Sequence, residues 1–475
     1  MKVISAFTNQ NFNFEKPEKN SELRKIAGKN ISLWDIKETH KEISLISFWP
    51  QKHSENDDRQ KLVLAVDAKQ VKKENSSTFE DVFYVRTGLY AGRISYGGVT
   101  FDIKPDCSDA LYERMLNFAN HIYIDKSEEK SQRKKDNKFP LIEYLFLSSL
   151  QRVSVLGFPQ EYSKQNYHDL NIHGGLDIQT YIKKDIPFTG MLSSRKNERC
   201  YVQSIVDVLY CALNSCRNEI KNNFKRLSLI KNELRASYSG RFPSQQTFQN
   251  AQTHRVLNNP MFAGFKQTLK FAEIVIKHNT IVPNAKTTNA MASGYLLDIA
   301  SLWEVYLEHL IKSRLEDWNV STQEELKLYK DCFFRRENRP DFVLRKKDGN
   351  GITILDAKFK RMDGVYKEYS DVDREDFFQI HSYAGYYREK GIKNIHCGLI
   401  YPLSKKKLDK NSANLYGLTD TEYIEDSSKT RFIVEGIYKG LKKKDDNSGF
   451  EDDAEYSVTV AEDAFIDRLR EFLAS

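Results

Sequence analysis

Cysteine is scarce in this sequence, and its spacing excludes several kinds of site. The six cysteines include no C-x-x-C pair, and no histidine lies at zinc-finger spacing from them. Neither a disulfide framework nor a structural zinc site is therefore expected. Reduced thiols in a cytoplasmic protein are the simplest interpretation.

Long apolar runs are also missing. The first residues, MKVISAFTNQNFNF, contain no stretch long enough for a signal peptide. Nowhere do roughly 18 apolar residues follow one another, so no membrane span is expected. Charge is nearly balanced, with 73 Lys and Arg against 66 Asp and Glu and a formal net charge of +7. This balance permits binding to a polyanion but does not demonstrate it.

A complete nucleotide-binding motif is a third absence. Gly92 and Gly97 have the first spacing of a phosphate-binding loop, but Gly98 and Val99 stand where Lys and Ser or Thr are required. We therefore expect this chain to bind no nucleotide. If nucleotide energy is used, another polypeptide must bind the nucleotide.

The chain has 475 residues, which is too long for one ordinary core and predicts two or three domains. Residues 1–125 are expected to form a β-rich N-terminal domain, because short apolar stretches alternate there with turn-rich segments. Gly97-Gly98 separates two alternating runs and predicts a hairpin. A helix is expected to follow at about Asp109–His121.

Residues 126–285 are predicted to form a mainly helical middle region. Its first part, residues 126–138, is almost free of apolar side chains and is typical of a solvated linker. The polar segment Ser237–Asn259 is interpreted as a break between helices. Apolar spacing predicts helices at about Leu141–Leu150, at Gln203–Ser237 with a strongly basic second face, and at Phe265–His278.

Residues 286–475 are predicted to form a C-terminal domain with a central mixed sheet. The order is a helix, strands, a helix and another strand, which is typical of an α/β domain, within a chain that is α+β overall. The expected elements are a helix at about Gly294–Arg314, strands at Phe342–Leu344 and Ile352–Leu355, a helix around Asp376–Lys390, a strand at His396–Tyr401 and a final helix at Ala461–Leu473.

The segment RPDFVLRKKDGNGITILDAKFKR, residues 339–361, carries the clearest chemical signal. Two β-prone runs flank a strong turn signal at 348–351, so a hairpin would bring Asp341 close to Asp356. Because side chains alternate along a strand, Asp356 and Lys358 project from one face. The alternative is a salt bridge on an exposed hairpin.

These residue types suit phosphodiester hydrolysis. Asp341 and Asp356, with the main-chain carbonyl of Ala357, would offer the oxygen ligands that Mg²⁺ prefers, and Mn²⁺ can substitute for it. The metal would neutralise the phosphate and lower the pKa of an attacking water. Lys358 would orient that water, help to deprotonate it, or hold the developing charge.

Helical position adds three weaker candidates. Glu304 lies at the edge of an apolar helix face, where a metal would give it a partner, although it could also reach solvent. Gln379 and Tyr383 are four residues apart and share a face of the next helix. Contact with the site or with the DNA backbone, helix capping and packing all remain open for these two.

At these residues the sequence resembles the PD-(D/E)XK nuclease superfamily. Pro340-Asp341 matches the first signature, and Asp356-Ala-Lys358 matches the D-x-K. Gln379–Tyr383 looks like the Q-x-x-x-Y element, and Glu304 stands where such folds often carry an acidic residue. The resemblance implies a restriction-endonuclease-like domain at residues 286–475.

A second resemblance covers more of the chain. Residues 91–116, 173–195 and 302–311 are similar to segments of McrC-type restriction subunits. The resemblance implies an Mg²⁺-dependent endodeoxyribonuclease whose other parts dock onto McrB, a separately encoded AAA+ GTPase that recognises modified DNA. The hairpin at Gly97-Gly98 could then enter the pore of that ring, and the basic helix at Gln203–Ser237 could lie against the ring or against DNA.

Two other interpretations stay open. In one, the chain is an adaptor that activates a AAA+ ring through its front part while its nuclease domain is vestigial. In the other, it is a stand-alone nuclease for DNA ends or RNA. The presence of Asp341, Asp356 and Lys358 together favours an active enzyme.

Overall fold

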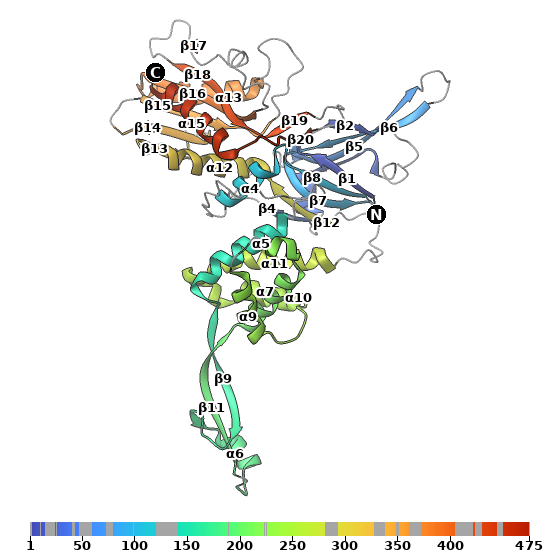
Figure 1. Cartoon of the computed structure of the whole chain (residues 1–475), viewed down its shortest axis with the longest axis vertical. Coiled ribbons are helices and arrows are strands. Elements are labelled where there is room, and N and C mark those ends of the chain that lie inside the picture. Colours follow the sequence, from blue (N-terminus) through green and yellow to red (C-terminus); the bar gives the residue numbers. More distant parts are fainter. Residues whose placement is uncertain are drawn as a thin grey trace, which may run out of the picture. The chain divides into compact units, whose positions relative to one another are not determined.

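The computed structural model divides into two compact units, and the middle of the chain forms a unit of its own (Figure 1). The large unit combines Met1–Asn137 with Lys286–Ser475, and the middle unit is Lys138–Ala285. The structure describes residues 2–9, 11–14, 24, 26–39, 43–46, 59–72, 79–97, 99–119, 141–188, 190–222, 224, 226–280, 293–326, 338–347, 351–360, 372–403, 421–422, 430–443 and 450–474. The linker predicted at 126–138 and most of the turn predicted at 348–351 lie outside these residues.

The first half of the large unit contains two sheets that share one apolar core, to which Val63, Val85 and Phe101 belong. In one sheet the strand order is β1 (Lys2–Phe7), β8 (Val99–Lys104), β7 (Tyr90–Tyr96), β12 (Ser293–Asp298) and β4 (Ile43–Ile46). In the other it is β2 (Asn11–Phe14), β6 (Phe79–Thr87), β5 (Leu62–Lys72) and β3 (Lys29–Ser32). The helices of this part are α2 (Leu33–Glu38) and α4 (Asp109–Ala119).

The predicted hairpin at Gly97-Gly98 is confirmed, since β7 and β8 pair antiparallel with Tyr96 opposite Val99. Gly97 has φ +57° in the turn, a conformation that favours glycine. A Cβ added to it would lie 2.2 Å from the side chain of Ile26, so the turn packs against the chain itself. One side of the turn is thus covered by the chain, and its entry into a partner ring stays a prediction.

The predicted helix at Gly294–Arg314 is wrong in its first part. Residues Ser293–Asp298 form β12, which pairs with both β7 and β4, and α12 begins only at Ile299 and ends at Arg314. A short apolar run can be a buried strand or the start of a helix, and periodicity does not distinguish the two. Because β12 completes the N-terminal sheet, the predicted division into residues 1–125 and 286–475 does not separate two structural units.

The second half of the large unit is built on the predicted mixed sheet. Its strand order is β13 (Trp318–Thr322), β14 (Phe342–Lys346), β15 (Gly351–Ala357), β16 (Asn394–Leu403), β18 (Arg431–Tyr438) and β17 (Thr421–Glu422). β14 and β15 are antiparallel, whereas β15, β16 and β18 run parallel. A small hairpin follows, made of β19 (Leu441–Lys443) and β20 (Phe450–Asp452).

Helices cover both faces of this sheet. α13 (Arg374–Glu389) packs Ile380 and Tyr387 into the apolar core on one face. α15 (Val458–Ala474) lies on the opposite face, where the ring of Phe472 is 4.9 Å from that of His396. The chain therefore has the mixed α/β fold expected from its sequence. Among the described residues, no helix has the length and apolar character needed to cross a membrane.

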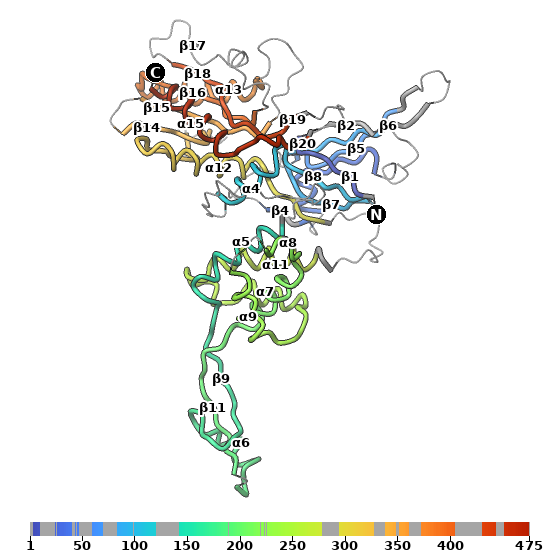
Figure 2. Tube along the Cα trace, in the orientation of Figure 1, coloured from blue at the N-terminus to red at the C-terminus, as the bar shows by residue number. Residues whose placement is uncertain are grey.

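The middle unit is helical, as predicted, but it also carries a long pair of strands (Figure 2). β9 (Gln160–Asp169) and β11 (Leu192–Tyr201) pair antiparallel along their whole length and extend away from the helices of the unit. Their far end holds β10 (Gly175–Leu176) and α6 (Ile178–Lys184). The prediction of a mainly helical region missed this hairpin, because its strands lack an alternating apolar face.

The long helix predicted at Gln203–Ser237 is also wrong. It is divided because Cys216 is extended, with ψ 148°, and its N–H donates to the carbonyl of Ala212 to end the first helix. The predicted break at Ser237–Asn259 contains a helix that Ser244 caps. Besides α6, the α-helices described in the unit are α5 (Leu141–Val153), α7 (Gln203–Ser215), α8 (Asn218–Lys221), α9 (Leu227–Ser237), α10 (Gln245–Thr253) and α11 (Phe265–Thr280).

Candidate active site

The candidate site lies at one end of the β14–β15 hairpin. Phe342 pairs with Leu355, and the same register continued by one residue places Asp341 opposite Asp356. The Asp341 side chain is buried and its two oxygens are held from different directions. Oδ2 accepts a hydrogen bond from the Ala357 N–H at 2.8 Å, and Oδ1 accepts one from Gln323 Nε2 at 3.0 Å.

Lys358 projects from the same face of β15 as Asp356, as the alternation of side chains predicts. Its Nζ lies 2.5 Å from Asp356 Oδ2, and it donates a hydrogen bond to Gln379 Oε1 at 3.0 Å. The Asp356 side chain is buried, and beyond this ionic contact its Oδ2 accepts no hydrogen bond from the described residues. One buried carboxylate oxygen is thus left facing an ammonium group.

Gln379 and Tyr383 connect this lysine to the chain segment before β14. Gln379 Nε2 donates to the hydroxyl of Tyr383 at 2.6 Å, and that hydroxyl donates to the carbonyl of Arg339 at 3.2 Å. Tyr383 also belongs to the apolar core under α13. The shared helix face predicted for these two residues therefore makes contact with the site, and Tyr383 serves packing as well.

The electrostatics of the site are those of crowded, buried carboxylates. Burial raises the pKa of Asp341 well above its usual range, and Asp356 and Glu304 raise it further. Burial, followed by Asp298 and Asp356, raises the pKa of Glu304 to about 8. Glu304 is thus within electrostatic range of the site, and no described residue donates a hydrogen bond to it. A further positive charge would stabilise this cluster.

Lys358 experiences opposing influences. Burial by itself would lower its pKa, but the neighbouring carboxylates of Asp356 and Asp341 outweigh that effect and raise it. The lysine is therefore held in its charged form. A permanently charged Lys358 suits a role in orienting groups or stabilising negative charge more than a role as a base.

Two charged residues beside the site were missed by sequence reasoning. Lys360 Nζ lies 3.0 Å from both carboxylate oxygens of Asp376, and the hydroxyl of Tyr401 donates to Asp376 Oδ2 at 3.1 Å. Asp376 Oδ1 is 3.9 Å from Lys358 Nζ. The available signals were the alternation that continues from Lys358 to Lys360 and the position of Asp376 three residues before Gln379.

The donor set suits a divalent cation with oxygen ligands. Within the described residues, no group of three or more His, Cys, Asp or Glu side chains is assembled as a metal cage. Mg²⁺ does not require one, because it commonly takes one or two carboxylates and fills its other positions with water and substrate oxygens. The buried Asp356 Oδ2 and the raised pKa of Asp341 fit such a site.

Comparison with known proteins gives matches along most of the chain. A family model described as McrBC 5-methylcytosine restriction system component matches residues 85–402. A chain from the refined half-complex of a tetradecameric assembly of Thermococcus gammatolerans McrB AAA+ hexamers with bound McrC is 13% identical, with a TM-score of 0.53. That match covers 99% of this chain and 100% of the other, so the two share a fold.

A chain from the cryo-EM structure of the Thermococcus gammatolerans McrBC complex is 14% identical, with a TM-score of 0.35. That match covers 68% of this chain and 90% of the other. A search of curated proteins found no match.

Proposed function

This chain belongs to the family of McrBC 5-methylcytosine restriction system components, as a McrC-type subunit, and from that premise we propose that it is a metal-dependent DNA endonuclease. The observation that carries the proposal is the set of buried charges at the end of the β14–β15 hairpin. Asp341, Asp356 and Lys358 have little exposure; Lys358 Nζ lies 2.5 Å from Asp356 Oδ2, and both residues act electrostatically on Asp341. Buried charges cost stability, so a set of them beside one another indicates a function.

The roles of the side chains follow from their contacts. Asp341 and Asp356 would hold Mg²⁺ or Mn²⁺, together with the carbonyl of Ala357, and Glu304 would add a carboxylate at the rim. When bound, the cation supplies charge neutralisation at the phosphate and lowers the pKa of a water molecule. Lys358 stays protonated and offers its ammonium to the developing negative charge.

Gln379 and Tyr383 act on Lys358 rather than on the phosphate. A cation at Asp356 competes with the ammonium for the same carboxylate oxygen, so Lys358 needs a second contact that keeps it in place. The hydrogen bond to Gln379 Oε1 provides that contact, and the Tyr383 hydroxyl fixes the orientation of the Gln379 amide. We assign these two as positioning residues.

The partner proposed for this subunit is a separately encoded AAA+ NTPase of the McrB type. The structurally similar McrC chain is seen bound to McrB AAA+ hexamers. In this chain, the far end of the β9–β11 hairpin, residues 170–191, exposes apolar side chains and is called the hairpin tip below. Exposed apolar clusters of this kind mark interaction sites. The exposed apolar side chains of the hairpin tip are those of Leu170, Ile172, Leu176, Ile178, Ile182, Ile186, Phe188 and Met191, with exposures from 41% to 73%.

We therefore assign AAA+ docking to the hairpin tip instead of to the Gly97 turn. Ile178 and Ile182 lie one turn apart on α6 and are 63% and 59% exposed. Both side chains already face water, so replacing them with glutamate or alanine should not disturb the fold. A surface of this kind is free to serve a partner.

Two other functions make different predictions. A vestigial nuclease domain would leave a chain that stimulates NTP turnover without cutting DNA. A stand-alone nuclease would cut DNA ends or RNA without a partner. The contacts among Asp356, Lys358, Gln379 and Tyr383 favour an active enzyme, because they fix the side chains that the chemistry needs. The exposed apolar hairpin tip favours an enzyme that works with a partner.

The metal requirement tests the proposal. The full chain is combined with its AAA+ NTPase and nucleotide, and cleavage of duplex DNA is followed with chelator and with Mg²⁺, Mn²⁺ or Ca²⁺. We expect cutting in Mg²⁺ and Mn²⁺ and none in chelator. Ca²⁺ should support DNA binding without cutting, because it activates water poorly. Cleavage that persists in chelator would contradict the proposal, and stimulated NTP turnover without cleavage in Mg²⁺ would establish the adaptor.

A further inference from the structure

The positive charge of the protein is concentrated in the middle unit. Residues 138–285 contain 19 Lys and Arg against 10 Asp and Glu, a net charge of +9. The rest of the chain contains 54 Lys and Arg against 56 Asp and Glu, a net charge of −2. The unit that contains the candidate active site therefore has no excess of positive charge with which to hold a polyanion.

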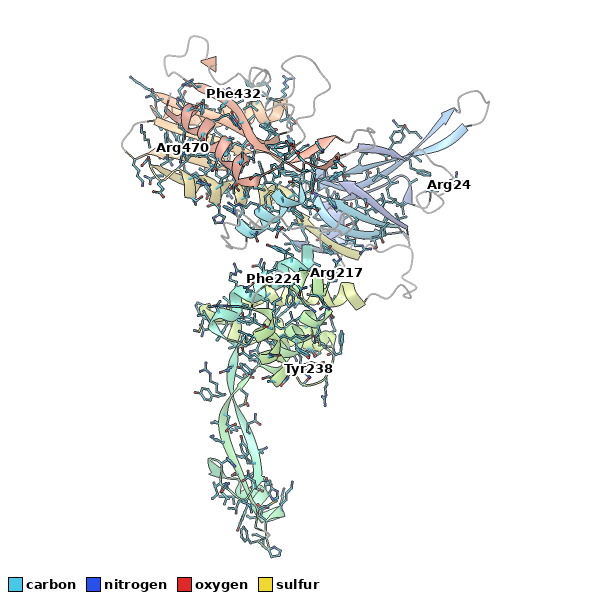
Figure 3. The ribbon with its side chains drawn as sticks, in the orientation of Figure 1. Arg24, Arg217, Phe224, Tyr238, Phe432 and Arg470 are labelled. Atoms are coloured by element: carbon cyan, nitrogen blue, oxygen red, sulfur yellow. The ribbon has the colours of Figure 1, made fainter. Side chains whose placement is uncertain are left out.

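Within the middle unit, the excess lies around α8 and α9. From Arg217 to Arg241 the sequence has seven Lys and Arg and two Glu. The side chains of Arg226, Lys231 and Arg235 are all exposed. In Figure 3 the labels of Arg217, Phe224 and Tyr238 mark the course of this segment. We call the exposed side chains of Arg226, Lys231 and Arg235, together with the half-buried Lys221, the α8–α9 basic surface.

The charges of this surface are not neutralised within the unit. Among the described residues, Arg226, Lys231 and Arg235 form no salt bridge. Glu233 on the same helix is bound by the hydroxyl of Tyr201 at 2.9 Å. Lys221 donates to the carbonyl of Asn214, and its pKa is lowered by burial and then by the nearby charge of Lys231. Like charges are thus gathered on this surface: Glu143 partly offsets Lys221, but no described carboxylate forms a salt bridge with the other three side chains.

The geometry of α9 suits a repeating anion. Lys231 and Arg235 are four residues apart, so they lie on one side of the helix, about 6 Å from each other at Cβ. Leu227, Ile230 and Leu234 on the neighbouring side are buried and fix the helix against the unit. Two long cationic side chains on a rigid helix can reach neighbouring phosphates of one strand.

We propose that the α8–α9 basic surface binds the phosphate backbone of duplex DNA. The choice of DNA over another polyanion rests on the proposed nuclease function. A protein partner with an acidic surface is the competing occupant, but a stable protein interface needs an apolar centre. In the middle unit most exposed apolar side chains are gathered at the hairpin tip, and α9 adds Leu229 alone, which does not make an apolar centre. The cations on this surface offer charge without sequence readout.

The salt dependence of DNA binding tests the proposal. The full chain is titrated against a short fluorescent duplex in chelator, at a series of salt concentrations, and compared with Lys231→Ala/Arg235→Ala. Loss of two phosphate contacts should lower the slope of log K against log salt by about 1.8. Lys266→Ala/Lys270→Ala is the matched control, since it removes the same charge at the same spacing from the exposed face of α11 in the same unit. Its slope should stay close to that of the wild type.

Every other outcome overturns the assignment. If the wild-type chain does not bind the duplex, this surface does not bind DNA. Equal slopes for Lys231→Ala/Arg235→Ala and the wild type would show the same. Equal loss in the test and control variants would indicate a general effect of net charge. Loss of co-elution with the AAA+ NTPase, with an unchanged DNA slope, would assign the surface to a protein. Binding is measured without cleavage, so the result is independent of whether the enzyme cuts.

Discussion

At the end of the β14–β15 hairpin the molecule buries charged side chains, and at the tip of the β9–β11 hairpin it exposes apolar ones. Asp356 is 1% exposed, whereas Ile178 is 63% exposed. A chain selected for stability would place these residue types the other way round. The two hairpins have the same secondary structure, but one ends in buried charged side chains and the other in exposed apolar ones.

The difference separates two kinds of functional site. The β14–β15 end is built from hydrogen bonds and ion pairs that fix each side chain, as chemistry at a defined point requires. The hairpin tip has apolar side chains on a two-stranded arm, as docking to a broad surface requires. Substitution of Asp356, Ile178 or Ile182 should therefore leave the stability of the fold unchanged or raise it, while the substitutions at the two places remove different activities.

The largest expected effect belongs to the hairpin tip. Ile178→Glu/Ile182→Glu should abolish co-elution with the AAA+ NTPase, stimulation of its NTP turnover and partner-dependent cleavage. The reason is that two exposed apolar contacts become charged, while both positions already face water. Co-elution and NTP turnover measure the effect. The melting temperature should stay at the wild-type value.

Tyr162→Glu provides the control for this variant. Tyr162 is 73% exposed on the same hairpin, but it lies on β9 opposite Arg199, towards the helices of the unit. It should leave stimulation intact. Equal stimulation by the wild type and by the isoleucine variant would show that the tip is not the docking surface.

A smaller effect is expected at Glu304. Glu304→Gln should lower the cleavage rate by at least about tenfold, which is about 1.4 kcal/mol in the barrier. It should at the same time raise the melting temperature above neutral pH, because it removes a charge from a crowded, buried cluster. Glu308→Gln, one turn later and paired with Lys312, is the control and should change neither quantity strongly. A wild-type cleavage rate in Glu304→Gln would show that Glu304 is not part of the active site.

The pH dependence of stability gives the Glu304 prediction a second measurement. Its pKa in the folded chain is about 8, above the ordinary value of 4.5. Between these values the folded state binds more protons than the unfolded state, so the free energy of unfolding falls as pH rises. Glu304→Gln should flatten that fall between about pH 4.5 and 8, measured by denaturant unfolding in chelator. An unchanged slope would contradict the assignment of the shift to Glu304.

The smallest effect is expected at Tyr383. Tyr383→Phe keeps the ring in the core but leaves the Gln379 amide and the Arg339 carbonyl without their shared hydroxyl. The free energy of unfolding should fall by about 1 kcal/mol. Cleavage should slow by less than about tenfold, because the hydrogen bond from Lys358 to Gln379 remains. Tyr386→Phe on the same helix is the control. An equal loss of cleavage rate in both variants would show that Tyr383 has no positioning role.

The sequence predicted the β14–β15 end well because its signals are local. Alternation places Asp356 and Lys358 on one face, and the short distance to Asp341 across a turn leaves few other pairings. Gln379 and Tyr383 were placed on one helix face for the same reason. What could not be predicted was their contact with Lys358, which depends on where α13 packs on the sheet.

The elements that were missed lack such local signals. The strands β9 and β11 carry polar residues on both faces, so they show no alternation from which a strand could be recognised. Residues 293–298 form the strand β12 because they pair with β7 and β4, which are distant in sequence. A fragment that ends before residue 293 would lack this strand, so partner binding is best measured on the full chain.

In our proposal the buried residues around Asp356 cut DNA, whereas the hairpin tip binds the AAA+ partner. The most direct test measures DNA cleavage and NTP turnover in one reaction, with the AAA+ NTPase, Mg²⁺ and the wild-type chain, Asp356→Ala or Lys358→Ala. We predict that each variant has no cleavage and full stimulation of NTP turnover. Asp356→Ala should keep at least the wild-type melting temperature, whereas Lys358→Ala should lower it, because it leaves the buried Asp356 without its ammonium partner. A folded Asp356→Ala chain that still cuts at the wild-type rate would contradict the account.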